Sequence, residues 1–191
     1  MRTTPMIVVM VLTLAAHGCK DLSSNPTDTT RTLIESSFEF QNQPSLSGWE
    51  DGYPMYAVKK ARYSFDSDVP PGGGQWSLRL QPPDTNATAM RFSVRPEQPS
   101  QYSNFRLTYW VKDKYSLGSY AVTLSAWMGS YSYGCAFRRS RSSEWEQDTV
   151  TYTSLNRTVD SLVVFVAMYF PYSKSDTSKY IWFDRFKIDQ F

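Results

Sequence analysis

The stretch that decides the fold is the last strand-like one, Tyr180-Ile181-Trp182-Phe183-Asp184-Arg185-Phe186-Lys187-Ile188-Asp189. Aromatic and β-branched residues predominate in it, as they do in β-strands. Its apolar residues alternate along the stretch, and the alternation slips by one residue at Asp184-Arg185. One extra residue in an alternating run is typical of a β-bulge, which redirects a side chain. We therefore expect a strand whose bulge redirects the carboxylate of Asp184.

Short alternating runs separated by turns make up the rest of the chain after residue 33. The clearest are Asn104–Lys112 and Ala121–Met128, whereas Ser161–Tyr169 is apolar on both faces and predicts a central strand. We find no long run with the 3.6-residue period of a helix in this part. About ten strands at short spacing, joined by turns rich in Gly, Pro, Ser and Asp, predict one all-β domain, a β-sandwich or jelly roll.

The N-terminal segment predicts export. One basic residue precedes an apolar run of about ten residues, which is too short to span a bilayer. The sequence Ala16-His17-Gly18-Cys19 that follows resembles the cleavage site of bacterial lipoproteins. This resemblance implies a signal peptide over residues 1–18 and a lipid on Cys19, with ordinary secretion as the alternative.

Lipidation of Cys19 would anchor the protein stably in a membrane of the bacterial cell envelope, because two acyl chains hold a protein there. Residues 19–32 are polar and without period, which predicts a disordered tether. Residues 33–191 then form the jelly-roll domain.

Cleavage before Cys19 would leave no histidine, because His17 is the sole one in the chain. That excludes Ser-His-Asp catalysis and histidine-bound zinc, iron or copper. Cys135 would stand alone, so we expect no intrachain disulfide and a buried thiol. The formal net charge of +2 gives no indication of a nucleic-acid partner. The sequence contains no signal for oligomerisation.

The order and spacing of several motifs resemble the galactose-binding-like jelly rolls, a superfamily that includes many carbohydrate-binding modules. The resemblance covers residues 33–191 and rests on the final strand and on four other runs: Ser36–Phe40, Gly74–Leu80, Phe105–Lys112 and Glu144–Gln147. It implies that the first and last strands of the domain are neighbours.

The same resemblance implies a structural calcium ion held by acidic residues on the terminal strands. Carried over to this chain, the expected ligands are Glu39 and Asp184, with Asp66 and Asp68 as further candidates. Calcium takes six to eight oxygen ligands, and backbone carbonyls of a turn could complete the set. The alternative is that these carboxylates pair with Arg185 or another arginine.

Two tryptophans are candidates for stacking against a sugar. Trp110 and Trp127 fall on the polar side of the two clearest strands, together with threonine and serine residues. An indole plane flanked by hydroxyl groups suits a sugar ring, which stacks its C–H face on the aromatic ring. The alternative is that a second sheet or a loop covers both side chains.

Aromatic residues in the predicted loops are further candidates for ligand binding, because loops commonly carry binding residues. The sequence alone does not choose between a strand face and the loops. The loop candidates are Trp49, Tyr53, Tyr131 and Tyr133.

Two charged clusters allow other functions. Arg138, Arg139 and Arg141 could contact an acidic glycan or lipid phosphates, or form a solvated turn. Paired carboxylates are the catalytic groups of glycosidases, and an acidic run is present at Glu144, Glu146 and Asp148. Acidic residues along one strand are more often surface charges, so we expect no enzymatic activity.

The sequence therefore predicts non-catalytic carbohydrate binding by a lipid-anchored protein of the cell envelope, with a polysaccharide or glycan as partner. The alternative is a structural or protein-interaction module with the same fold and no sugar site. A polysaccharide hydrolase or lyase is the third hypothesis. Exposed aromatic residues with polar neighbours would favour the first, and an exposed apolar patch would favour the second.

Overall fold

The computed structural model describes residues 30–46, 48–51, 62–81, 88–96, 104–113, 120–129, 131–138, 142–153, 158–168 and 180–191. In these ranges the chain forms strands joined by turns. None of the described residues forms a helix long and apolar enough to cross a membrane. The signal peptide, Cys19 and most of the tether predicted from the sequence lie outside the described residues.

The strands follow one another along the chain as short extended runs. They are β1 (Arg31–Ser36), β2 (Glu39–Phe40), β3 (Gln43–Pro44), β4 (Trp49–Asp51), β5 (Arg62–Asp66), β6 (Ser77–Gln81), β7 (Thr88–Val94), β8 (Asn104–Lys112), β9 (Tyr120–Met128), β10 (Tyr131–Arg138), β11 (Glu146–Thr153), β12 (Ser161–Met168) and β13 (Ile181–Gln190).

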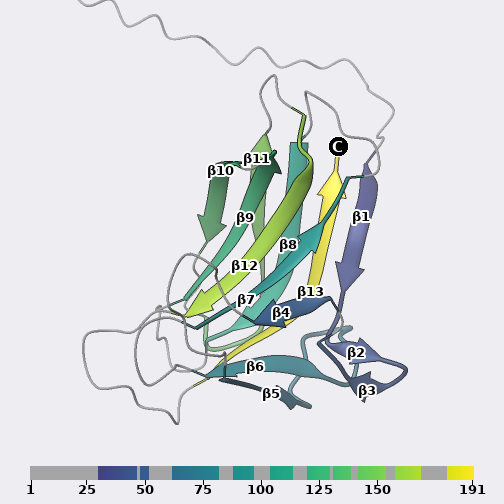
Figure 1. Cartoon of the computed structure of the whole chain (residues 1–191). Coiled ribbons are helices and arrows are strands. Elements are labelled where there is room, and N and C mark those ends of the chain that lie inside the picture. The colour runs from purple at the N-terminus through teal and green to yellow at the C-terminus, as the bar shows by residue number, and fades with distance from the viewer. Residues whose placement is uncertain are drawn as a thin grey trace, which may run out of the picture.

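Two antiparallel sheets pack face to face as a β-sandwich (Figure 1). Within the described residues, the six-stranded sheet has the order β11-β8-β13-β6-β5, with β1 also paired to β13, and the five-stranded sheet has the order β10-β9-β12-β7-β4. Strands β2 and β3 form a small separate hairpin. The all-β sandwich predicted from the sequence is confirmed.

Strand β13 organises the six-stranded sheet. One side of it pairs with β8, and the other side pairs with β6 up to Phe183 and with β1 from Phe186 onward. The register shifts between Asp184 and Lys187, and Arg185 has a left-handed backbone with φ 49°. The predicted bulge is therefore present, and it lies where the neighbouring strand changes from β6 to β1. The implied pairing of the first and last strands is also present.

The core lies between the two sheets and is built by alternate residues of each strand. In β8 the residues Phe105, Leu107, Tyr109 and Val111 are buried, and the residues between them are partly or fully exposed. Strand β12 lies between β7 and β9, and it is buried on both faces, with Val163, Phe165 and Ala167 buried on the outer face. Both features follow the sequence predictions.

Two boundaries differ from the sequence predictions. Strand β1 begins at Arg31, two residues before the predicted start of the domain. Tyr131 and Tyr133 were predicted to lie in a loop, whereas β10 begins at Tyr131. The register of β10 against β9 shifts between Tyr133 and Cys135, so the glycine between them lies at a bulge and does not end the strand. Tyr131 and Tyr133 are therefore strand residues.

Candidate functional site

The two tryptophans predicted to stack on a sugar lie on opposite sides of the sandwich. Trp110 belongs to β8 of the six-stranded sheet and stands between the buried Tyr109 and Val111, so it points away from the core. Trp127 belongs to β9 of the five-stranded sheet and follows the buried Ala126, so it also points outward. Both are half-buried. The two residues cannot form one platform, so each face must be judged separately.

Hydroxyl groups flank Trp127 on the outer face of the five-stranded sheet. Across the sheet its neighbours in register are Ser132 of β10 and Ser161 of β12. The indole N–H of Trp127 is buried, and no described residue accepts a hydrogen bond from it. A buried donor without an acceptor costs about 1–3 kcal/mol, so it calls for an explanation.

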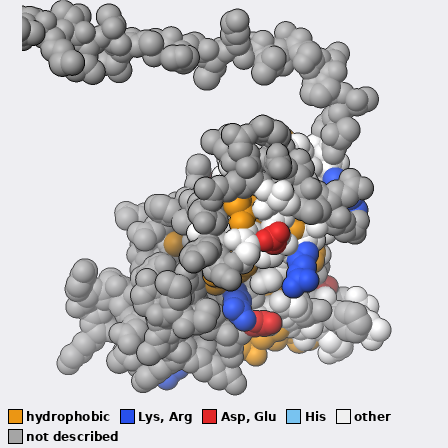
Figure 2. Space-filling view, turned by 45° about the horizontal axis from the view of Figure 1, so that its top comes forward, with side chains coloured by type: hydrophobic (Ala, Val, Ile, Leu, Met, Phe, Trp, Pro, Cys, Tyr) orange, Lys and Arg blue, Asp and Glu red, His pale blue; other side chains and the backbone are white. Residues whose placement is uncertain are grey.

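A second polar group occurs further along the same face. Both Nε and Nη2 of Arg91 donate hydrogen bonds to one oxygen of Glu50, at 2.8 and 2.6 Å. Across the sheet, Arg91 of β7 is in register with the buried Phe165 of β12. Phe165 is in turn in register with the half-buried Thr123 of β9. Oppositely charged side chains lie next to one another in the space-filling view (Figure 2). Between Trp127 and Arg91 the outward residues Ser125, Val163 and Phe165 are buried. The accessible groups of this face are therefore Trp127 with Ser132 and Ser161 and, separate from them, the Arg91–Glu50 ion pair.

Trp49 was predicted as a loop aromatic and is instead a core residue. It starts β4, is 6% exposed and packs against Phe38, Phe92 and Phe186. Its indole N–H donates a 3.2 Å hydrogen bond to Ser36. The prediction that Trp49 is an exposed binding aromatic is therefore wrong. Tyr53 and the side chains of Tyr131 and Tyr133 lie outside the described part of the structure.

The predicted calcium ligands come together at the bulge of β13. Oxygen Oε1 of Glu39 accepts hydrogen bonds from the backbone N–H groups of Gln75 and Trp76. Oxygen Oδ1 of Asp184 accepts one from the backbone of Arg185 at 2.8 Å, whereas Oδ2 is buried without a partner among the described residues. Glu39 is close enough to Asp184 for its charge to raise the pKa of Asp184.

A glycine-rich loop wraps around these two carboxylates. A Cβ atom on Gly74 would collide with the carboxylate of Glu39. A Cβ atom on Gly73 would lie 2.9 Å from the carbonyl oxygen of Pro70 and 3.2 Å from Oδ2 of Asp184. The loop backbone thus approaches both acids closely, which only residues without a side chain allow.

Burial raises the pKa of Asp184 from 3.8 to about 6. The hydrogen bond from the backbone of Arg185 opposes this shift, the charge of Glu39 adds to it, and the guanidinium of Arg185 opposes it. Burial beside a second carboxylate disfavours the charged form of Asp184, and the guanidinium of Arg185 offsets this only in part. The guanidinium of Arg185 donates hydrogen bonds to the carbonyl oxygen of Gly72 at 2.7 Å and to Oε1 of Glu35 at 3.4 Å.

The donor set at the bulge fits a hard cation. The unpartnered oxygen of Asp184, the carboxylate of Glu39 and the carbonyl oxygen of Pro70 are oxygen donors of the kind that calcium prefers. Among the described residues, no group of three or more Asp, Glu, His or Cys side chains could hold a metal ion. Backbone carbonyls would therefore have to supply part of the coordination.

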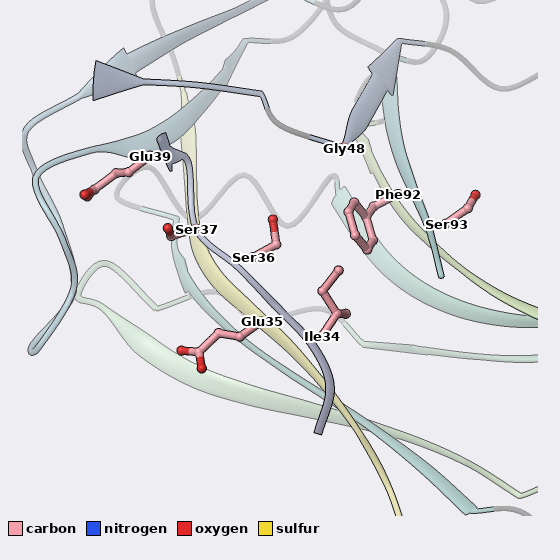
Figure 3. Close-up of a pocket in the computed structure, with 8 residues that line it drawn as sticks. All are labelled: Ile34, Glu35, Ser36, Ser37, Glu39, Gly48, Phe92 and Ser93. Atoms are coloured by element: carbon pink, nitrogen blue, oxygen red, sulfur yellow. The ribbon is translucent and has the colours of Figure 1, made fainter. Parts of the chain in front are cut away.

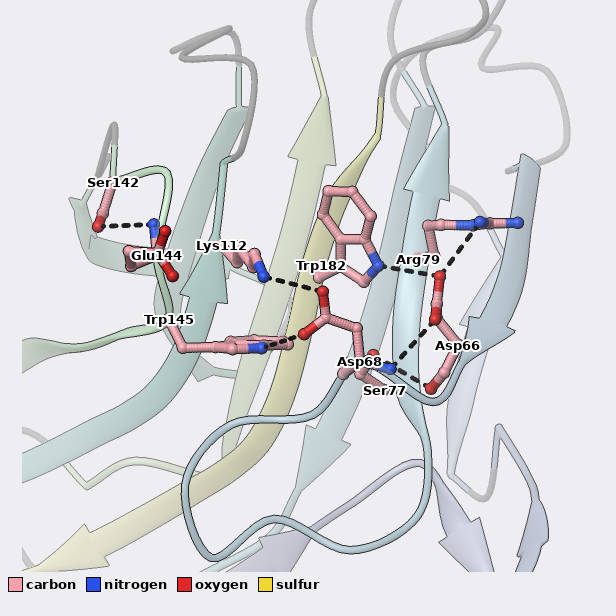
Figure 4. Close-up of polar contacts among 9 residues, drawn as sticks. All are labelled: Asp66, Asp68, Ser77, Arg79, Lys112, Ser142, Glu144, Trp145 and Trp182. Carbon is pink, nitrogen blue, oxygen red and sulfur yellow. Dashed lines mark hydrogen bonds and ion pairs between the residues drawn. The ribbon is translucent and has the colours of Figure 1, made fainter.

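Asp66 and Asp68 have other partners in the structure. Asp66 accepts from Arg79 at 3.1 Å and from the indole of Trp182 at 3.2 Å. Asp68 accepts from Lys112 and from the indole of Trp145, each at 2.8 Å (Figure 4). Each aspartate thus bridges one cation and one indole N–H. Among the described residues they do not join Glu39 and Asp184 in a group of three or more acidic side chains, so their prediction as further calcium ligands gains no support.

Replacing Asp68 with alanine should lower the free energy of unfolding by about 1–2 kcal/mol, because Lys112 and Trp145 both lose an acceptor. Urea unfolding would measure this. Glu50→Ala is the matched control, because it breaks an exposed ion pair and should cost no more than about 0.5 kcal/mol. Any stabilisation by calcium should persist in Asp68→Ala. Its disappearance would show that Asp68 takes part in calcium binding.

The acidic run near β11 does not form one site. Glu144 and Glu146 are exposed, whereas Asp148 is buried and accepts a 3.3 Å hydrogen bond from the hydroxyl of Tyr109. Of the basic cluster, Arg138 ends β10, and its side chain lies outside the described residues, as do Arg139 and Arg141.

No protein-family model matches the chain, and no curated protein matches its sequence. Its fold, however, is similar to that of several solved structures. One is the CBM22-1 xylan-binding domain from Paenibacillus barcinonensis Xyn10C, with a TM-score of 0.52 and 14% identity over 84% of this chain and 94% of that one. The fold resembles carbohydrate-binding modules. A family 16 module is similar as well, with a TM-score of 0.50.

Enzymes share the same architecture. A Stig cyclase from Fischerella sp. TAU has a TM-score of 0.52 and 13% identity, covering 83% of this chain and 98% of the cyclase. The enzymatically active domain of bacteriophage CBA120 tailspike protein 4 has a TM-score of 0.54 and 12% identity over 76% of this chain, which spans 20% of that structure. At such identities the similarity shows the fold alone.

Proposed function

We propose that this domain binds a carbohydrate without catalysing a reaction, on the outer face of the five-stranded sheet. The observation that carries the proposal is Trp127, an outward-facing indole between Ser132 and Ser161 whose N–H lacks an acceptor among the described residues. The ring offers a stacking surface, and the two serines offer hydrogen bonds to sugar hydroxyls. The fold similarity to the CBM22 and CBM16 modules supports this function.

The surface of the described residues gives little support to a protein-interaction module. Such a module needs an exposed apolar patch. Among the described residues, the exposed large hydrophobic side chain is Phe191 at the C-terminus, over which the guanidinium of Arg106 lies at 4.7 Å. A single residue of this kind does not make an interface.

Retention of the mature chain by a panel of insoluble and soluble polysaccharides tests the proposal. The chain would comprise residues 19–191 with Cys19→Ser to prevent lipidation, and xylan and cellulose would be in the panel. Specific retention of the folded protein by at least one polysaccharide is expected. Absence of retention by every member, with the protein folded, would make the interaction module the better hypothesis.

We further propose that calcium binds between Glu39 and Asp184 and stabilises the fold. The ion would balance two neighbouring carboxylates and would join the hairpin β2–β3, the glycine-rich loop and the bulge of β13. It would lie at the six-stranded sheet, away from Trp127, so its role would be structural.

Anchoring through a lipid on Cys19 is proposed from the N-terminal sequence. In bacterial cells that express the full chain, we expect labelled palmitate to be incorporated and the protein to fractionate with the envelope membranes. Cys19→Ser should abolish both. Equal labelling of the Cys19→Ser chain would refute lipidation at this position.

A further inference from the structure

A pocket of about 450 Å³ opens on the flank of the sandwich (Figure 3). Its walls are residues 34–37 at the end of β1, Glu39, Gly48 just before β4, and residues 92–93 of β7. Strand β1 belongs to the six-stranded sheet, and β4 and β7 belong to the five-stranded sheet. The pocket, which we call the flank pocket, therefore lies between the edges of the two sheets. Its volume is in the range of small-molecule sites.

Hydroxyl groups line the flank pocket. Oγ of Ser36 accepts the hydrogen bond from the indole of Trp49, so its own hydrogen remains to be donated. Ser37 and Ser93 also line the pocket, and their hydroxyls have no hydrogen-bond partner within the described ranges. Ser36 is 8% exposed and is held in place by the core through Trp49. The pocket thus contains one fixed donor and two adaptable hydroxyl groups.

The charges around the flank pocket do not favour an anion. None of the described residues that line it is a lysine or an arginine, so none of them offers a charged partner to an anion. Of the two carboxylates that line it, Glu35 pairs with Arg185 at 3.4 Å. Glu39 accepts hydrogen bonds from the backbone N–H groups of Gln75 and Trp76 and is a ligand of the proposed calcium ion. The remaining lone pairs of the two carboxylates can accept hydrogen bonds from neutral donors. The chemistry therefore favours a neutral ligand rich in hydroxyl groups.

Two apolar side chains complete the flank pocket. Ile34 and Phe92 point toward one another with Ser36 beside them, and Glu35 and Glu39 extend away from Phe92 (Figure 3). An apolar wall beside hydroxyl donors and carboxylate acceptors matches a sugar ring, which has an apolar C–H face and polar edges. We propose that the flank pocket is a second binding site, which takes a neutral mono- or disaccharide independently of the Trp127 face.

Amide resonances of the ¹⁵N-labelled mature chain test this proposal. The protein, with Cys19→Ser, is titrated with xylose, glucose, galactose, xylobiose and cellobiose. At least one sugar should shift the resonances of residues 34–37 and 92–93 in a saturable manner. Ser37→Leu, which fills the pocket and removes a hydroxyl, should abolish these shifts. Ser93→Ala, at an exposed position where folding is not at risk, should weaken binding by about threefold to tenfold.

Trp127→Ala separates the two sites. It should leave the sugar-induced shifts at residues 34–37 unchanged even where it abolishes polysaccharide retention. If sugars shift the flank-pocket resonances but no polysaccharide retains the protein, the flank pocket is supported as a sugar site and the Trp127 face is not. The proposal is overturned if none of the five sugars shifts residues 34–37 and 92–93, or if the shifts persist in Ser37→Leu.

Discussion

Trp127→Ala should weaken binding of the best-retained polysaccharide by about thirtyfold or more. Residues that anchor an interface contribute about 2 kcal/mol or more when truncated, and each 1.4 kcal/mol corresponds to a tenfold change in affinity. Trp127 is an outward indole of the five-stranded sheet, and its removal deletes the stacking surface. Isothermal titration calorimetry with a soluble oligosaccharide of that polysaccharide would measure the loss.

Trp110→Ala is the matched control for this prediction. Trp110 is also a half-buried, outward-facing tryptophan in the middle of a sheet, but it lies on the opposite side of the sandwich. Its replacement should change the stability of the domain about as much and leave the affinity unchanged. If Trp110→Ala abolished binding and Trp127→Ala did not, the site would belong to the six-stranded sheet.

Calcium should raise the melting temperature of the domain by about 5–10 °C relative to protein in a chelator. A ligand present at about a hundred times its dissociation constant stabilises the folded state by about 2.7 kcal/mol. For a domain of this size, each kcal/mol corresponds to about 2–4 °C. Differential scanning calorimetry in calcium, in magnesium and in chelator would measure the effect. Equal melting temperatures in all three would refute the calcium site.

Replacing Asp184 with asparagine tests which residue is responsible for the predicted stabilisation by calcium. The change removes the buried charge and keeps an oxygen that can accept the hydrogen bond from the backbone of Arg185. The variant should lose the stabilisation by calcium. In chelator at pH 7, however, it should be at least as stable as the unmodified chain, because the uncompensated carboxylate is gone. A variant that keeps the full calcium effect would contradict the role of Asp184.

The pH dependence of the calcium-free protein follows from the raised pKa of Asp184. The folded state holds this proton more tightly than the unfolded state, since its pKa is about 6 instead of 3.8. The contribution of this protonated carboxyl to the stability of the folded state is therefore fully present below pH 4, and it is lost as the pH rises through about 6. A shift of this size corresponds to roughly 2–3 kcal/mol. Bound calcium takes the place of the proton, so this loss should disappear in its presence.

Local patterns were enough to predict several features of the fold. The phase slip at Asp184-Arg185 marked the bulge, because alternation in a strand is strict and one extra residue breaks it. The outward faces of β8 and β9 followed from the same alternation. The pairing of the first and last strands came from the family resemblance instead, since no local pattern specifies which strands become neighbours.

The sequence could not show that Trp110 and Trp127 lie on opposite sides of the molecule. Their strands are consecutive and similar in pattern, and consecutive strands are often neighbours in one sheet. Here the chain crosses from the six-stranded to the five-stranded sheet between them, and β8 pairs with β11 and β13 instead. Only these long-range pairings decide which residues share a face.

Trp49 and the flank pocket were missed for a related reason. The glycine, acidic and aromatic residues around Trp49 look like a loop, but pairing with β7 and packing against Phe38 and Phe186 make it a core residue. The flank pocket lies between β1 and β7, which are distant in sequence. Nothing in the sequence distinguishes its serines from other serines of the chain. No spacing rule would have grouped them.

The most direct test of the proposed function is the indole N–H resonance of Trp127 during titration with an oligosaccharide of the retained polysaccharide. Assignment by Trp127→Phe and Trp110→Phe would separate the two signals. A sugar that stacks on the five-stranded sheet should shift the Trp127 signal in a saturable manner and leave the Trp110 signal in place. A Trp127 signal that stays fixed while the oligosaccharide binds would contradict the proposed site.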